Sequence, residues 1–204
     1  MKQKRIHILC ECGILVALAV TLSILSKLLL EPLLTPLFPF GGSVTLFSML
    51  PICLISIRHG IGWGLGSAFC FSWFQVLQGG VFAWGLTPMM LIASLLLDYI
   101  LAFTVLGLAG LFRRYGAWGR LSGVILVCLL RFLVHFLSGI VLWANFAEFI
   151  AFGAEWVNRP VLYSLVYNGG YMLPETVLTV IGAVLLFRLS QVRKLLGEKQ
   201  TEKA

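Results

Sequence analysis

Residues 163–175 read YSLVYNGGYMLPE and lie within an otherwise apolar stretch, 160–187, that is long enough to cross a membrane as a helix. Three polar side chains in this stretch, Asn168, Tyr171 and Glu175, are spaced i, i+3 and i+7. On a helix this spacing places them on one face. Because polar groups are costly in lipid, we expect this stripe to face protein or a cavity.

The same stretch predicts an irregular helix. Pro174 cannot donate a hydrogen bond to the carbonyl of Gly170, and Gly169 adds further backbone freedom, so the pattern predicts a break. Transporters use broken helices at membrane depth to build substrate sites. Tyr163 and Tyr167 would then extend an aromatic wall toward the outer end. The alternative is a kinked helix whose tyrosines pack against neighbouring helices.

The whole chain has the composition of an integral membrane protein. Of its 204 residues, 60% are hydrophobic and 11% are charged, against about 45–50% and about 25% in soluble domains. Since a helix needs about 20 apolar residues to cross the hydrocarbon, we predict an all-α membrane protein with six transmembrane helices. We expect a single domain, 1–204, that ends in a basic cytoplasmic tail at 188–204. The six expected spans are 8–30, 45–57, 61–79, 87–111, 121–144 and 160–187.

Basic residues indicate the orientation of these spans. They fall at the N-terminus, after the second and fourth spans, and in the tail, and they are Lys2, Lys4, Arg5, Arg58, Arg113, Arg114, Arg120, Arg188, Arg193, Lys194, Lys199 and Lys203. By the positive-inside rule we expect a multi-pass protein of the cytoplasmic membrane with both termini in the cytoplasm. The net charge of +7 then reports topology and does not indicate nucleic-acid binding. The outer half is left acidic, which suits a cation arriving from outside.

Two further spans carry polar side chains. Asp98 lies near the middle of the fourth span, where a carboxyl group costs about 3 kcal/mol on insertion scales. It is expected to receive a cationic or amine-bearing ligand, and the alternatives are an ion pair with Arg131 or a hydrogen bond to a neighbouring helix. His135 and Trp143 lie on the fifth span, where eight residues advance a helix by about 12 Å, so both can line one elongated pocket. The alternatives are ordinary packing for the histidine and a place in the interfacial aromatic belt for the tryptophan.

Together these residues predict an outward-facing ligand pocket with aromatic faces, carboxylates, an asparagine and a histidine. Such a lining suits a small, flat, nitrogen-rich cation held by stacking, cation–π attraction and charge-assisted hydrogen bonds. The five cysteines show no metal-ligand spacing, and we expect neither a metal nor a cofactor. An enzyme is not expected either, because the sequence offers no nucleophile–base pair, metal cluster or HExxH motif.

Four segments, in this order along the expected spans, resemble a known family. They read GGSVTLFSMLPI (41–52), LLDYILAFTVLGLAG (96–110), HFLSGIVLW (135–143) and YSLVYNGG (163–170). The chain is similar, over roughly 10–190, to the thiamine-specific substrate-binding (S) component of energy-coupling factor transporters. The resemblance implies a six-helix protein that captures thiamine outside the cell with high affinity. It also implies assembly with a transmembrane coupling subunit and two cytoplasmic ATPase subunits.

The resemblance implies six ligand contacts, which are Asp98, Tyr99, His135, Trp143, Tyr163 and Asn168. These side chains would hydrogen-bond to and stack on the aminopyrimidine and thiazolium rings. Tyr171 and Glu175 join them from the spacing argument alone. Asp98 stands where the family has a glutamate, and no acid precedes MLPI, although Glu31 in the first outer loop could replace that charge. A thiamine precursor or another vitamin is therefore the alternative ligand.

The first span offers a surface for the coupling subunit. Ala17 and Thr21 are four residues apart, a small-xxx-small spacing that permits close helix contact. The resemblance implies docking of the coupling subunit at this place, and packing within the chain is the alternative. No G-x-x-x-x-G-K-[ST] motif occurs in the sequence, so ATP hydrolysis has to come from a partner. The other functions considered are a standalone secondary transporter driven by an ion gradient and a scaffold protein.

Overall fold

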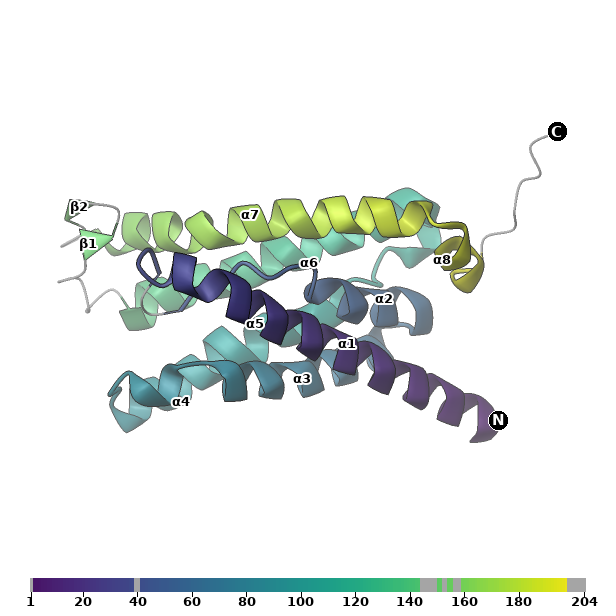
Figure 1. The fold of residues 1–204 in the computed structure, drawn as a ribbon, viewed down its shortest axis with the longest axis horizontal. Coiled ribbons are helices and arrows are strands. Elements are labelled where there is room, and N and C mark those ends of the chain that lie inside the picture. The colour runs from purple at the N-terminus through teal and green to yellow at the C-terminus, as the bar shows by residue number, and fades with distance from the viewer. Residues whose placement is uncertain (1, 39–40, 144–149, 152–153, 156–158, 198–204) are drawn as a thin grey trace.

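The computed structural model describes residues 2–38, 41–143, 150–151, 154–155 and 159–197. In chain order the elements are α1 (Lys2–Leu34), α2 (Met49–His59), α3 (Ile61–Gln78), η1 (Val81–Ala83), α4 (Pro88–Ser94), η2 (Leu95–Leu101), α5 (Ala102–Thr104), η3 (Val105–Leu108), η4 (Arg113–Tyr115), α6 (Gly116–Ser138), η5 (Gly139–Trp143), β1 (Ile150–Ala151), β2 (Ala154–Glu155), α7 (Pro160–Arg188) and α8 (Ser190–Leu195). The long helices run side by side, and the start of α1 lies at the same end as α8, while the antiparallel pair β1 and β2 lies at the opposite end (Figure 1).

Four helical stretches in the described part of the chain are long and apolar enough to cross a membrane. They are Gln3–Leu34, Pro88–Leu108, Arg113–Trp143 and Pro160–Arg188. The expected spans at 45–57 and 61–79 correspond to α2 and α3, and α2 has 11 residues, about half the length that a helix needs to cross alone. The count of six spans therefore stays a prediction. Residue 144 of the fifth expected span and residues 198–204 of the tail lie outside the described residues.

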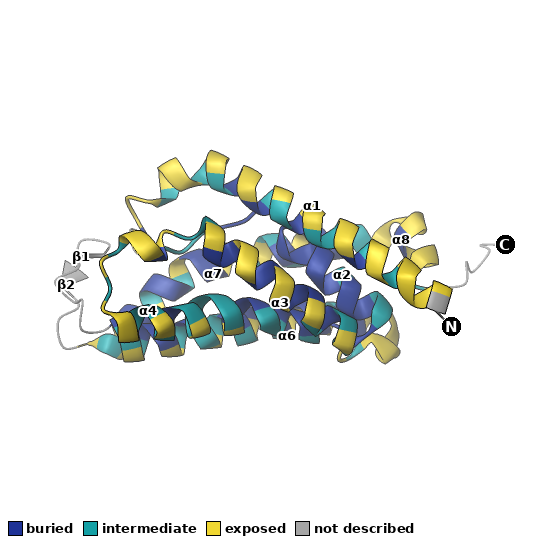
Figure 2. Ribbon diagram, turned by 90° about the horizontal axis from the view of Figure 1, so that it is seen from below, coloured by how far each residue is buried: buried dark blue, intermediate teal, exposed yellow. Residues whose placement is uncertain are grey.

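The outer surface of the helices is apolar. On α1, the side chains of Ile14, Leu28 and Leu33 are each 70% exposed, and Figure 2 shows exposed positions repeating along this helix. In water such a surface would drive association, whereas in a bilayer it contacts lipid tails. The structure thus has the surface of a membrane protein.

The chain between α1 and α2 is not helical. Val44, Thr45 and Ser48 are buried although residues 41–48 form no regular element. The start expected for the second span is therefore wrong, because the helix begins only at Met49. The backbone N–H of Thr45 donates to the carboxylate of Glu175 on α7, and the backbone N–H of Leu46 donates to the Ser26 hydroxyl at 2.7 Å. Side chains of other helices replace helical hydrogen bonds here.

Helix α7 continues through its proline. It extends from Pro160 to Arg188 with Pro174 inside it, so the predicted break at this point is wrong. A proline inside a helix removes one hydrogen bond and crowds the carbonyl four residues earlier. That carbonyl belongs to Gly170, and the helix nevertheless continues for more than three turns beyond the proline, to Arg188. The polar face of α7 stays continuous as a result.

Two apolar clusters divide the interior. The larger one is built around Met49, Ile52 and Phe71 and includes residues of α1, α5, η3 and α6. The second is rich in aromatic side chains and consists of Phe38, Val44, Trp143, Tyr163, Tyr167, Tyr171 and Met172. This aromatic cluster surrounds the polar groups of α6 and α7 described next.

Candidate functional site

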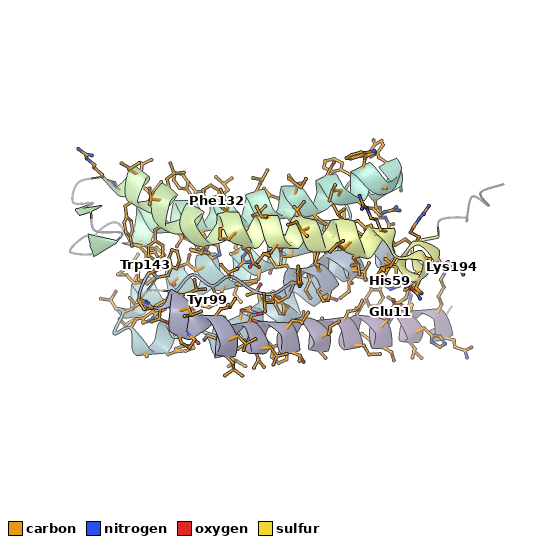
Figure 3. All side chains as sticks on the ribbon, turned by 45° about the horizontal axis from the view of Figure 1, so that its top comes forward. Glu11, His59, Tyr99, Phe132, Trp143 and Lys194 are labelled. Carbon is orange, nitrogen blue, oxygen red and sulfur yellow. The ribbon has the colours of Figure 1, made fainter. Side chains whose placement is uncertain are left out.

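A cavity of about 340 Å³ lies among α1, residues 41–45, the end of α3, η2, α6, η5 and α7. Seven of the eight side chains expected to bind a ligand line it, and they are Asp98, Tyr99, His135, Trp143, Tyr163, Asn168 and Tyr171. In Figure 3, Tyr99 and Trp143 lie toward the end of the molecule remote from Glu11, His59 and Lys194. The fold thus gathers residues from distant parts of the sequence around one space.

Asp98 is the centre of a hydrogen-bonded group. It lies on η2, a π-helical stretch, and such stretches are frequent at functional sites. One carboxylate oxygen accepts hydrogen bonds from Trp143 Nε1 at 3.1 Å and from the Ser94 hydroxyl at 2.9 Å, while Nδ1 of His135 lies 3.4 Å from the other oxygen. These donors fix the carboxylate at the cavity wall. Within the described ranges, no three His, Cys, Asp or Glu side chains are grouped to hold a metal ion.

Tyrosines on one face of α7 form an aromatic wall. The rings of Tyr163 and Tyr167 lie 5.6 Å apart, and the ring of Phe38 meets Tyr167 and Tyr171 edge-on at 5.4 and 5.6 Å. The hydroxyl of Tyr167 also donates to the carbonyl of Gly41 at 2.7 Å. Edge-to-face packing and this hydrogen bond fix the rings, which suits stacking on a flat ligand.

Two further aromatic side chains complete the cavity. Trp84 meets Trp143 edge-on, with ring centroids 5.5 Å apart. Tyr99 packs against the backbone at Gly79, where an added Cβ would lie 2.6 Å from Cε1 of the tyrosine ring. Gly79 therefore leaves room for Tyr99 at the wall, and a larger residue would displace the ring.

Asn168 holds three parts of the wall together. Its amide nitrogen donates to the carbonyl of His135 at 3.2 Å and to the carbonyl and hydroxyl of Ser164, both at 3.1 Å. Its amide oxygen accepts a hydrogen bond from the hydroxyl of Tyr171 at 2.7 Å. Asn168 thus links α6 to α7 and fixes Tyr171. The spacing of Asn168 and Tyr171 on one helical face agrees with the sequence.

Glu175 lies outside the lining. Its carboxylate accepts hydrogen bonds from the backbone N–H and the hydroxyl of Thr45, and it is fully buried. Arg131 Nη1 lies 3.8 Å from Glu175 Oε1, so the arginine that was considered as a partner for Asp98 instead faces Glu175. Glu175 continues the stripe of Asn168 and Tyr171 but does not line the cavity, and it instead binds Thr45, which does.

The opposite wall contains polar residues that the sequence analysis did not single out. They come from α1 and α3, and they are Ser23, Ser26, Lys27, Gln75 and Gln78. Ser23 accepts a hydrogen bond from Gln75 at 2.8 Å and donates one to Gln78 at 3.2 Å, and Lys27 donates to the carbonyl of Gln78. The signal was present, because serines and glutamines spaced by three residues in apolar helices also form stripes.

The residues expected to contact a partner lie apart from the cavity. Ala17 and Thr21 are exposed on α1, and the Thr21 hydroxyl donates to the carbonyl of Ala17 at 2.9 Å. Packing within the chain therefore does not cover them in this structure. Glu31 is also exposed and lies 3.6 Å from the ammonium group of Lys27, and both residues line the cavity.

Comparisons with known proteins agree on one family. The family described as thiamine transporter protein (Thia_YuaJ) matches residues 9–195. The thiamine transporter ThiT of Bacillus subtilis is 35% identical over 199 residues, which cover 91% of this chain and 93% of that protein. ThiT of Lacticaseibacillus paracasei is 28% identical over 66% of this chain and 68% of its own length. The solved structure of ThiT from Listeria monocytogenes matches with a TM-score of 0.69 and 25% identity, covering 95% of this chain and 98% of that one.

Proposed function

Since the chain belongs to the thiamine transporter protein family, we propose that it captures thiamine with high affinity outside the cell as the substrate-specific subunit of an ATP-driven energy-coupling factor transporter. The chain is a membrane transport protein and not an enzyme. In the proposed complex, a transmembrane coupling subunit and two cytoplasmic ATPase subunits drive uptake. The lack of a phosphate-binding motif in the sequence supports this division of labour.

The chemistry of thiamine matches the cavity. Thiamine joins a flat aminopyrimidine to a thiazolium ring with a permanent positive charge. Asp98 supplies a fixed negative charge, and the rings of Tyr163, Tyr167 and Trp143 supply faces for stacking and cation–π contact. The observation that carries the proposal is the carboxylate of Asp98, which Trp143 and Ser94 fix at the wall of an aromatic cavity.

We further propose that Tyr99, His135, Asn168 and Tyr171 contact the ligand. All four line the cavity. His135 lies beside the Asp98 carboxylate, and tyrosine hydroxyls can donate to ring nitrogens.

In the bilayer we propose six spans with both termini in the cytoplasm. The proposal rests on the distribution of basic residues and on the common end shared by α8 and the start of α1 (Figure 1). Tyr99 and Trp143 lie toward the other end (Figure 3), so this orientation opens the cavity to the outside. Helix α2, most of whose residues are buried, would then cross within the protein, while α3 would present Phe69, Trp73 and Leu77 to the lipid.

Titration of the detergent-purified chain with thiamine, followed by tryptophan fluorescence, tests the proposed ligand. We expect saturable quenching at nanomolar concentrations, because Trp143 and Trp84 line the cavity. The free aminopyrimidine and riboflavin are titrated in parallel. Tighter binding of either one than of thiamine would contradict the assignment and identify the alternative ligand.

The partner requirement is tested in proteoliposomes. The chain is reconstituted alone or with a coupling subunit and its ATPases, and uptake of labelled thiamine is measured with and without ATP. We expect uptake only in the complete complex with ATP. Uptake by the chain alone in an ion gradient would overturn this part of the proposal and indicate a standalone secondary transporter.

A further inference from the structure

A buried arginine lines the cavity that we assign to a cation. Arg131 is 2% exposed, and its guanidinium carbon lies 4.2 Å from the ring centroid of Phe103. Its Nη1 lies 2.9 Å from the sulfur of Met49. At an effective dielectric constant of about 20, two positive charges about 8 Å apart would weaken binding roughly thirtyfold. Left alone, this guanidinium would repel a thiazolium ring.

The opposing charge comes from a carboxylate that does not reach the cavity. Glu175 Oε1 lies 3.8 Å from Arg131 Nη1, and the Glu175 side chain has no exposed surface. Both carboxylate oxygens accept hydrogen bonds, one from the backbone N–H of Thr45 and the other from its hydroxyl. The hydroxyl of Ser48 donates to Thr45 Oγ1 at 2.7 Å. Acceptance at both oxygens is the pattern of an ionised carboxylate.

Thr45 connects this ion pair to the cavity surface. Residues 41–45 all line the cavity, and they have no helical hydrogen bonds of their own. Tyr167 binds this segment at Gly41, and Glu175 binds it at Thr45. The Glu175 carboxylate therefore lies beside the buried guanidinium of Arg131 and also binds the segment 41–45 through Thr45.

We propose that Glu175 is a positioning residue that makes the cavity selective for a cationic ligand. Its negative charge balances that of Arg131, so the electrostatic potential at the ligand is set by the carboxylate of Asp98 and is negative. Glu175 also fixes residues 41–45 through its hydrogen bonds to Thr45. This inference rests on the proposed function, because it assumes that a cation binds beside Asp98. It differs from direct contact between Glu175 and the ligand, which the burial of Glu175 excludes in this structure.

The test compares two ligands of the same shape. Thiamine carries the charged thiazolium ring, and deazathiamine carries an uncharged thiophene in its place. The variant Glu175→Gln keeps the size of the side chain and one acceptor oxygen for Thr45 while it removes the charge. We expect Glu175→Gln to weaken thiamine binding at least about tenfold, which corresponds to about 1.4 kcal/mol, and deazathiamine binding less than about threefold.

Two further variants keep the test decisive if Glu175→Gln does not fold. Neutralising both partners in Arg131→Gln/Glu175→Gln removes the unpaired buried charge, and we expect it to return the ratio of the two affinities to within about threefold of wild type. Arg131→Gln alone should shift this ratio further toward thiamine. Glu11→Gln, at the remote end of the molecule (Figure 3), removes the same formal charge and should leave the ratio unchanged.

An equal loss for both ligands, or an unchanged ratio in Arg131→Gln, would overturn the inference and leave Glu175 with a structural role only. If the wild-type chain binds deazathiamine as tightly as thiamine, the cavity does not select for charge and the inference is also wrong. Failure of the wild-type chain to bind thiamine at all would instead overturn the proposed function, so the two failures are distinguishable.

Discussion

The indole nitrogen of Trp143 donates a hydrogen bond to the carboxylate of Asp98 at 3.1 Å, although 45 residues separate them in the sequence. Both residues lie on π-helical stretches, Asp98 on η2 and Trp143 on η5. A π-helical turn changes the direction of the side chains that follow it relative to an α-helix. The meeting of the two stretches thus defines one corner of the cavity.

This corner predicts the effect of removing the charge of Asp98. The variant Asp98→Asn keeps an acceptor for Trp143 but loses the attraction for the thiazolium ring, so we expect thiamine affinity to fall about fiftyfold or more. Fluorescence titration measures this change, and circular dichroism and thermal unfolding show whether the variant is folded. Wild-type affinity in a folded Asp98→Asn protein would contradict the assignment of the pocket.

Gly79 predicts a steric effect at the wall. In Gly79→Ala the new Cβ meets the ring of Tyr99, and the backbone at this position is extended, with φ of −74°, so no strain is added. We expect roughly tenfold weaker thiamine binding, because the Tyr99 ring moves. Gly66→Ala on the same helix is the matched control, since its Cβ meets no atom within 4 Å. Equal affinities in the two variants would show that Tyr99 does not contact the ligand.

The exposed residues Ala17 and Thr21 on α1 predict that a substitution there abolishes transport but leaves ligand binding intact. In Ala17→Leu a bulky side chain occupies a surface that we assign to the coupling subunit. We expect unchanged thiamine affinity in detergent and loss of uptake in the reconstituted complex. Cys70→Leu on α3, at another exposed position, should keep both activities. Normal uptake by Ala17→Leu would place the docking surface elsewhere.

The proposed orientation predicts which residues are accessible from each side. In a background with the five cysteines replaced by alanine, Lys194→Cys on α8 should react with a membrane-impermeant maleimide only in inside-out vesicles. Ala83→Cys, which is exposed and directly precedes the cavity-lining Trp84, should react only in intact cells. The reverse pattern would place the cavity on the cytoplasmic side.

The sequence predicted which side chains lie together best for polar residues that lipid would not accommodate. Asp98, His135 and Asn168 are polar groups on apolar helices, and burial in lipid would be costly for each. Their hydrogen bonds in the structure connect them to one another and to the chain around them. Periodicity and polarity were sufficient to predict that they gather together.

Other features depended on contacts that a periodic pattern does not contain. The helical start expected at residue 45 was wrong because Glu175 and Ser26 bind the backbone of residues 45 and 46. The break expected at Pro174 was wrong because α7 continues through the proline from Pro160 to Arg188, so the loss of one helical hydrogen bond does not end it. In both cases a few hydrogen bonds decide where a helix begins or whether it continues, and these depend on tertiary packing.

The wall formed by α1 and α3 was missed for a different reason. Serine and glutamine satisfy one another in pairs such as Ser23 and Gln75, so their presence in a helix gives no clear indication of a ligand. Glu175 was expected at the ligand because it shares a face with Asn168 and Tyr171. Glu175 instead binds Thr45 in the non-helical segment 41–45, and no helical pattern predicts that contact.

Helix α1 is a wall one helix thick. Ser23 and Ser26 line the cavity, while Ala17, Thr21 and Leu25 on the same helix are exposed. Any contact that tilts α1 from outside therefore changes the space available to the ligand. By thermodynamic linkage the effect is reciprocal, so ligand occupancy must change the affinity of that outer contact by the same factor. A neighbour in the bilayer whose contact tilts α1 would thus be held with different strength by the loaded and the empty protein.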